Sequence, residues 1–344
     1  MKIKNKIEIL DKKAFKSGDD NPISLVNGKV GHCIYLYSVG RISGNKQFQQ
    51  MAELLTGEIF EQVTKIKAFD IKNGLSGIGL GFDYLIENKY MEGNVNDILE
   101  EVDNALFKQI CNHNNLNNSD VSLQLQLIYY FTVRLKTQKK NSENEYFFKE
   151  VIIDAINFIS EKIYSIFSEE SQAFNMENTS ILSLLVLSQC DKLYKEKIGR
   201  ILKDISFSIL SKIPVLHANR LYLLYAMDRI NKKIKTNGWS EHIKLLARET
   251  DIEHIIEKEL ADDIYFSNGL SAIYFLLSGL QDYFPSYQTC KYKELIINKI
   301  ENSPIWDRLI DDDFYMKHNN GLFSGYKGTS LLLHKHYKDE NRFN

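Results

Sequence analysis

The segment NGLSGIGLGFDYL, residues 73–85, carries four glycines inside an otherwise apolar helical pattern. Glycine in a helix interior costs about 0.5–1 kcal/mol relative to alanine, so this density needs a structural reason. Gly74, Gly77 and Gly81 recur at spacings of three and four, which places them on one side of a helix. We expect these glycines to let crowded helices approach closely, and we expect Asn73 to act as the N-cap.

The same pattern returns along the chain at intervals of roughly 40–55 residues, a period typical of helical-pair repeats. Each copy begins with a small or amide residue and continues into an apolar run with helical spacing. The copies with glycines lie at 27–40, 73–85, 267–280 and 323–336, and degenerate copies without them begin at Asp120, Glu177 and Leu216. The chain therefore contains about seven repeat units.

The segments between the copies have a different character. In residues 45–65, apolar side chains such as Phe48, Met51 and Leu55 recur at helical spacing between charged residues, which predicts a helix with one buried face. The chain thus alternates apolar inner helices with amphipathic outer ones. We predict an all-α protein, an α/α toroid of about seven inner/outer helix pairs, formed by one domain over 1–344 with residues 1–20 as a lead-in.

Composition excludes several classes of function. The net charge is −2 and no long basic block occurs, which argues against nucleic-acid binding. No apolar stretch approaches the ~20 residues of a membrane span, and the N-terminus lacks the apolar core of a secretory signal. The four cysteines are scattered, which indicates reduced, buried thiols and a cytoplasmic protein. A phosphate loop is disfavoured because no convincing strand precedes the glycines.

Two longer stretches suggest a family. Residues 73–107, NGLSGIGLGFDYLIENKYMEGNVNDILEEVDNALF, resemble the second repeat of the lanthionine synthetase C (LanC-like) cyclases, and residues 25–39, LVNGKVGHCIYLYSV, resemble the first. The resemblance implies an α/α toroid and a role in modifying ribosomal peptides. Cyclases of this family hold zinc through a cysteine in a W-C-Y-G turn and a Cys-His pair in a C-H-G turn. The zinc presents a substrate cysteine as thiolate for addition to a dehydrated residue, and a nearby acid protonates the enolate.

The zinc motifs are replaced in this chain. By repeat register, the W-C-Y-G turn falls on Leu216-His217-Ala218-Asn219, and the C-H-G turn falls on Ser267-Asn268-Gly269. A histidine that the family places at the fourth inner helix falls on or near Glu177. One imidazole, one hydroxyl and one amide form a poor zinc site, because zinc prefers Cys, His or carboxylate ligands. We therefore expect no metal and no other cofactor.

Several residues remain candidates for a site, each with a plainer alternative. The catalytic candidates are His217, Glu177, Asp262 and Asp263, and the binding candidates at the mouth of the toroid are Ser267, Asn268, Tyr326 and His318. The plainer interpretation is the favoured one: His217 as an ordinary histidine at a helix start, Asn268 as an N-cap, and the two aspartates as solvated loop carboxylates. We expect His242 and His254 to be solvated, and His334 and His336 to diverge on their helix.

These observations leave three hypotheses. The first is a LanC-like protein without the cyclase zinc site, acting as a peptide-binding or accessory component of lanthipeptide-type modification, with a precursor peptide and other modification enzymes as partners. The second is an active zinc-dependent thioether cyclase with altered ligands, including His217. The third, a glycoside hydrolase, needs paired carboxylates beside aromatic platforms, whereas the chain has only two tryptophans and no such pairing at the repeat starts.

Overall fold

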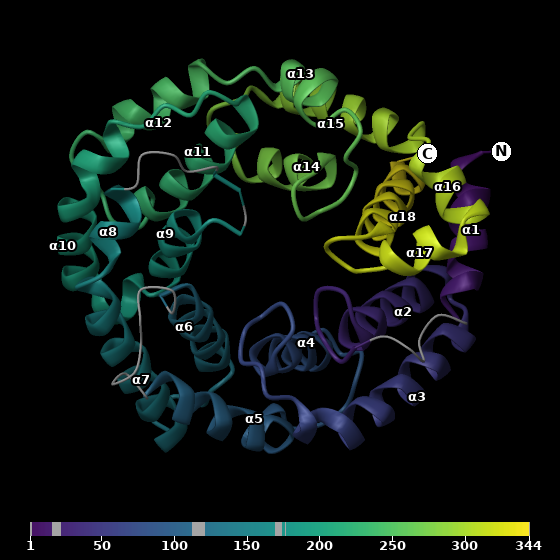
Figure 1. Ribbon diagram of the computed structural model, residues 1–344, viewed down its shortest axis with the longest axis horizontal. Coiled ribbons are helices and arrows are strands. Elements are labelled where there is room, and N and C mark those ends of the chain that lie inside the picture. Colours follow the sequence, from purple (N-terminus) through teal and green to yellow (C-terminus); the bar gives the residue numbers. More distant parts are fainter. Residues whose placement is uncertain (1, 16–21, 112–120, 169–173, 176, 344) are drawn as a thin grey trace. The chain divides into compact units, whose positions relative to one another are not determined.

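A computed structural model describes residues 2–15, 22–111, 121–168, 174–175 and 177–343, with side chains through Lys338. Every regular element in this part of the chain is a helix, and no strand occurs in it. Within the same ranges, no helix is long and apolar enough to cross a membrane. Figure 1 shows the order of the helices along the chain.

The contacts divide the chain into two compact units. The first unit comprises Met1–Leu99, Leu260–Tyr274 and Lys293–Asn344, and the second comprises Glu100–Glu259 and Phe275–Tyr292. Each unit is described separately below. Whether the chain folds as the single domain expected from the sequence stays a prediction.

The first unit joins the two ends of the chain. Helix α2 (Lys29–Ser43) packs against α3, which follows it, against α4, the next repeat helix, and against α18 (Tyr326–Phe343), the last helix of the chain. Helix α1 packs on the short helix α16. The segments α2 and α18 therefore lie side by side although they are far apart in sequence (Figure 1). The helices are α1 Ile3–Ala14, α2 Lys29–Ser43, α3 Lys46–Gln62, α4 Leu75–Glu87, α16 Ile305–Asp311, α17 Asp313–His318 and α18 Tyr326–Phe343, with a 3-10 turn at Val63–Lys65.

The second unit is a run of neighbouring helix pairs. Helix α9 packs between α6 and α11, and α6 and α11 each also contact the helix that follows them. The helices are α6 Val121–Lys136, α7 Glu143–Ser160, α8 Ile163–Ser168, α9 Thr179–Gln189, α10 Asp191–Leu210, α11 His217–Asn231, α12 Trp239–Arg248, α13 Ile252–His254 and the π-helix Ile255–Glu259. The helices α5 Val95–Ile110, α14 Leu270–Gly279 and α15 Ser286–Glu301 each contribute residues to both units.

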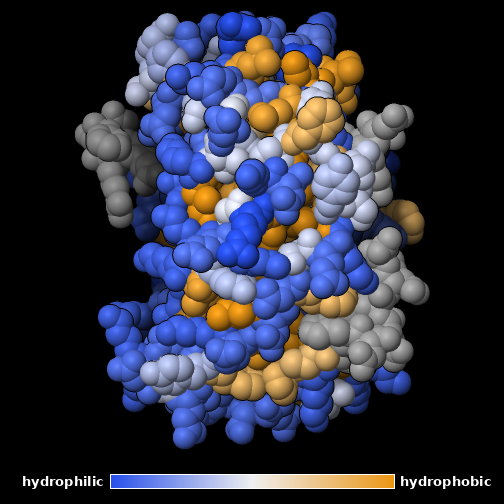
Figure 2. Space-filling view, turned by 90° about the vertical axis from the view of Figure 1, so that its left-hand side faces the viewer, coloured by the Kyte–Doolittle hydropathy of each residue, from blue (hydrophilic) through white to orange (hydrophobic). Residues whose placement is uncertain are grey.

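The predicted repeats coincide with helices. Each repeat segment corresponds to one helix, in order α2, α4, α6, α9, α11, α14 and α18. An amphipathic helix follows each of the first six. Figure 2, which faces the part of the molecule around α10, shows a mainly hydrophilic surface with scattered apolar residues. The alternation read from the sequence is therefore present in the structure.

The glycines have a different role from the one we expected. A Cβ on Gly74 would lie 2.5 Å from the carbonyl carbon of Ala68, and one on Gly77 would lie 1.9 Å from the carbonyl oxygen of Ile71. The loop before the helix thus folds back onto the first helical turn, and the obstructing residue is six positions earlier in each case. Only Gly81 meets another helix, since its Cβ would lie 2.2 Å from Val30 of α2. The first two glycines therefore accommodate a loop, and the third accommodates a helix.

The expected asparagine caps are wrong. Helix α4 begins after Gly74, helix α2 begins after Gly28, and neither receives a side-chain cap. The first helical N–H instead donates to a carbonyl seven residues earlier: Lys29 to Pro22, Leu75 to Ala68, Leu270 to Asp263, and Tyr326 to Asn319. The folded-back loop therefore satisfies N–H groups that a helix start otherwise leaves free. This backbone bond, shared by the four helices, explains why the motif recurs. The same N–H groups would be needed to bind an anion such as phosphate, and the loop already occupies them.

The expectation about the cysteines needs partial revision. Within the expected lead-in, residues 3–14 form helix α1, which packs on α16. Cys33 and Cys190 are buried as expected, whereas Cys111 and Cys290 are exposed. All four have free thiols.

Candidate functional site at the start of helix α11

A carboxylate from a distant segment caps helix α11. The Oε1 atom of Glu259 accepts the backbone N–H of His217 at 2.9 Å, and its Oε2 atom accepts that of Ala218 at 2.8 Å. A negative charge at this position also interacts favourably with the helix dipole. The repeat that lacks the glycine motif thus uses a side chain where the others use a loop carbonyl. The degenerate repeat at α9 does the same, because Asn178 accepts from the N–H of Ile181.

A π-helical turn brings a second histidine to this point. His254 ends α13, and Ile255–Glu259 forms the π-helix that follows. Because π-helical bonding joins residues five apart, His254 and Glu259 come onto one face of this turn. His254 Nε2 lies 4.0 Å from Glu259 Oε1, and the His254 and His217 rings are 5.1 Å apart between centroids. His254 is exposed, as expected, and it also lies close to His217 and Glu259.

Hydrogen bonds fix the tautomer of His217. Its Nδ1 atom accepts the backbone N–H of Asp251 at 3.0 Å and lies 3.2 Å from Nη1 of Arg220, which is also a donor. A nitrogen that faces two donors carries no proton, so in the neutral ring the proton is on Nε2. His217 thus presents an N–H donor on the side away from Asp251.

The described residues offer one group of possible metal ligands, and it includes His217. Ligand atoms of His217, His254 and Glu259 all lie within 4.8 Å of one another. Two histidines and a glutamate match the composition of known catalytic zinc sites. The arrangement does not fit zinc, because the unprotonated nitrogen of His217 is already occupied by two donors. One of those donors is the Arg220 guanidinium, whose charge repels a cation.

The candidates Ser267 and Asn268 lie in the first unit, in the turn before α14. The backbone N–H of Ser267 donates to the Phe323 carbonyl at 3.0 Å. Asn268 does not cap its helix: its Oδ1 atom is buried and has no hydrogen-bond partner among the residues that the structure describes. Asp263 accepts the N–H of Tyr265 through Oδ1, and burial raises the pKa of its carboxyl despite this bond. Gly269 is required here, since a Cβ would lie 2.3 Å from Asp263 Oδ1.

Four other candidates occupy varied positions. Asp262 and Glu177 are exposed, and Glu177 donates its backbone N–H to Asn175 just before α9. His318 is exposed at the end of α17, where Nδ1 bonds to the Phe314 carbonyl and the ring lies 4.2 Å from the Phe314 ring. Tyr326 is fully buried at the start of α18, packed edge-on to Tyr35. Tyr326 is therefore closed to a ligand approaching from solvent.

An exposed apolar loop leads into the α11 site. Ile213, Val215 and Leu216 are 50%, 86% and 51% exposed. Arg220 holds this loop, because its guanidinium donates to the carbonyls of Pro214 and Val215 and to that of Glu249. The apolar side chains are thus displayed by an anchored backbone.

Sequence reasoning found His217 and missed its partners. Glu259 lies 42 residues from His217 along the chain, and Asp251 lies 34 away. Neither belongs to a motif, so periodicity gives no signal for them. His242 was also misjudged, because it is buried and its Nε2 bonds to the Lys212 carbonyl; burial lowers its pKa.

Comparison with known proteins gives a match in structure and none in sequence. No protein-family profile matches the sequence. No curated protein sequence matches it either. Among solved structures, nisin cyclase superposes with a TM-score of 0.65, covering 97% of this chain and 93% of that one at 13% sequence identity. The predicted fold class is therefore confirmed: this chain has the all-α, α/α-toroid fold of nisin cyclase.

Proposed function

We propose that this protein is a peptide-binding or accessory component of lanthipeptide-type ribosomal peptide modification, and that it acts without the cyclase zinc site. Its direct partner is the precursor peptide, and other modification enzymes are further partners. The fold shared with nisin cyclase supports the type of pathway. The observation that carries the proposal is local: the position of a zinc-ligand cysteine in the resembling family holds His217, within a saturated hydrogen-bond network.

The anchored loop supplies the binding surface. Exposed apolar side chains that are held in place lose little conformational entropy when a partner covers them. Burying one large apolar side chain contributes about 1.5–3 kcal/mol. Ile213 and Val215 together can therefore account for a substantial part of the affinity for an extended peptide with apolar side chains.

The polar groups beside the loop suit a peptide backbone. His217 presents an Nε2–H donor, and His254 is about half exposed. Peptide carbonyls and hydroxyls are acceptors for such donors. The Glu259 carboxylate is committed to the helix start, so it is not free to act as an acid or base without uncapping α11.

A binding experiment tests the proposal. Fluorescence anisotropy with a labelled precursor peptide encoded beside this gene should show saturable binding to the full chain. The double variant Ile213→Ser, Val215→Ser should bind roughly tenfold or more weakly. Phe207→Ser is the matched control, because Phe207 is 81% exposed on α10 and outside the loop. Equal losses in both variants, or no binding by the wild type, would count against the proposal.

The zinc-dependent cyclase with altered ligands remains the second candidate. Its ligands would be His217, His254 and Glu259, which lie within one small region, and it requires zinc to displace the donors that face Nδ1 of His217. The assay is thioether formation on a dehydrated precursor peptide, with zinc measured in the same samples. One zinc per chain, lost together with activity in His217→Ala, would replace the first proposal by this one.

A further inference from the structure

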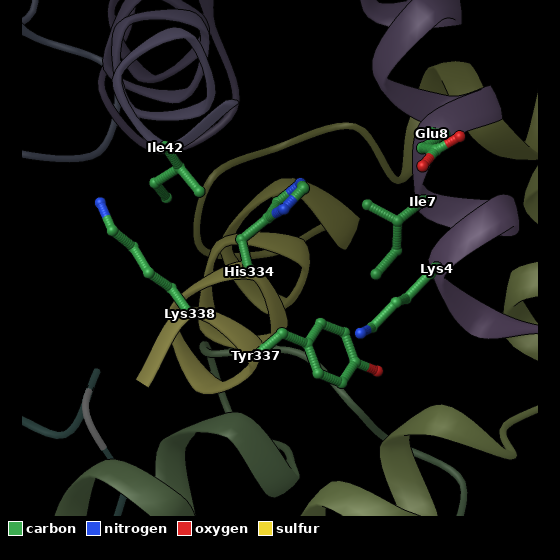
Figure 3. A pocket seen from close by; sticks show the side chains of 7 residues that line it. All are labelled: Lys4, Ile7, Glu8, Ile42, His334, Tyr337 and Lys338. Atoms are coloured by element: carbon green, nitrogen blue, oxygen red, sulfur yellow. The ribbon is translucent and has the colours of Figure 1, made fainter. Parts of the chain in front are cut away.

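A pocket of about 450 Å³ lies in the first unit between α1, α2 and α18. None of its lining residues belongs to the α11 site. Figure 3 shows His334 in its middle, with Lys338 and Ile42 on one side and Lys4 and Ile7 on the other. A pocket of this size accommodates a small organic molecule. The lining residues are Lys4, Ile7, Glu8, Ile42, His334, Tyr337 and Lys338.

A buried carboxylate orients the central histidine. Asp11 is 5% exposed, accepts a hydrogen bond from the buried hydroxyl of Tyr35, and lies 3.2 Å through Oδ2 from His334 Nε2. Nε2 is therefore the protonated nitrogen. Nδ1 has no partner among the described residues, and it is available to a ligand in the pocket.

The pocket wall combines positive charge with apolar surface. Lys4 and Lys338 contribute two ammonium groups against the single lining carboxylate of Glu8. The ammonium of Lys4 lies 4.5 Å from the centre of the Tyr337 ring, and the Tyr337 hydroxyl donates to Glu301, which holds that ring in place. Ile7, Ile42 and the lysine stems provide the apolar part.

We propose that this pocket binds a small organic anion, a carboxylate attached to an apolar body. Lys4 and Lys338 pair with the carboxylate, and Ile7 and Ile42 contact the apolar body. His334, whose ring Asp11 holds through Nε2, lies between these groups. This site is independent of the peptide surface at α11, so either proposal can fail without the other.

Isothermal titration of the full chain with sodium octanoate tests the site. We expect saturable one-to-one binding. Octylamine, with the same chain and the opposite charge, should not bind. Binding of octylamine or of inorganic phosphate as tightly as octanoate would overturn the proposal, because charge sign and apolar body are both required.

Variants assign the groups. Lys338→Gln should weaken octanoate binding about fivefold. Lys335→Gln removes the same charge from an exposed position on α18 outside the pocket lining, and should leave the affinity unchanged. Equal effects of the two lysine variants would contradict the assignment.

Discussion

At the scale of single residues, the glycines of the repeat motif are contact points for the backbone of a loop. Gly28, Gly74 and Gly269 each face a residue six positions earlier, at distances that leave no room for a Cβ. The sequence identified the motif and its helices correctly. It did not reveal why glycine is needed at these positions, because the atoms that a Cβ would meet belong to an irregular loop whose path has no periodic pattern.

Gly77→Ala should destabilise the protein by about 2–4 kcal/mol, because the new methyl group would meet the Ile71 carbonyl oxygen at 1.9 Å. Gly57→Ala is the control: this glycine is exposed in α3, and a Cβ added there would meet nothing within 4 Å. It should stabilise the protein by about 0.5–1 kcal/mol. Urea denaturation measures both free energies of unfolding, and similar values for the two variants would argue against the packing role.

Lys327 should make stability depend on pH. Its side chain is buried, has no hydrogen bond or ion pair to any described residue, and burial lowers its pKa from 10.5 to about 7. Between these values the unfolded chain binds the proton and the folded chain does not. The free energy of unfolding should therefore rise with pH above 7, by at most about 1.4 kcal/mol per unit.

The control is the Lys327→Met variant, whose free energy of unfolding is measured between pH 7 and 8.5 beside that of the wild type. Burial lowers the pKa of His32, so His32 titrates below this window. Burial raises the pKa of Cys33 from 9.0 to about 12, so Cys33 titrates above it. Neighbouring titrations thus contribute little there. The variant should lack the rise, and a parallel rise in both proteins would show that another group causes it.

At the scale of elements, the repeats divide by how the helix start is satisfied. Helices α2, α4, α14 and α18 use the carbonyl of a folded-back loop, whereas α9 uses Asn178 and α11 uses Glu259. The helix boundaries were predictable because apolar periodicity and turn residues are local signals. The cap of α11 was not, because Glu259 reaches it through tertiary structure and a π-helical turn.

Glu259→Ala should cost about 1.5–3 kcal/mol, since it leaves two backbone N–H groups at the α11 start without their charged acceptor. Asn178→Ala removes one neutral cap from α9 and should cost about 1 kcal/mol. Thermal and urea unfolding give the two values. A Glu259→Ala variant as stable as the wild type would mean that water replaces the carboxylate at no cost.

At the scale of the whole molecule, the fold and the chemistry are separable. Thirteen per cent identity to nisin cyclase over nearly the full chain accompanies the same fold. Helix pairing tolerates wide sequence change because it depends on apolar pattern and volume. A zinc site depends on individual donor atoms, so the substitution of single ligand residues removes it even where the fold is kept. The sequence therefore predicted the fold from patterns spread along the chain, whereas the environment of His217 required the structure.

Zinc content per chain tests the central claim most directly. The measurement is elemental analysis of the full chain, purified without chelators and dialysed against zinc-free buffer. We expect well under one zinc per chain, with no further loss in His217→Ala, because the unprotonated nitrogen of His217 is bound to Asp251 and Arg220. One zinc per chain in the wild type that disappears in His217→Ala would contradict the account.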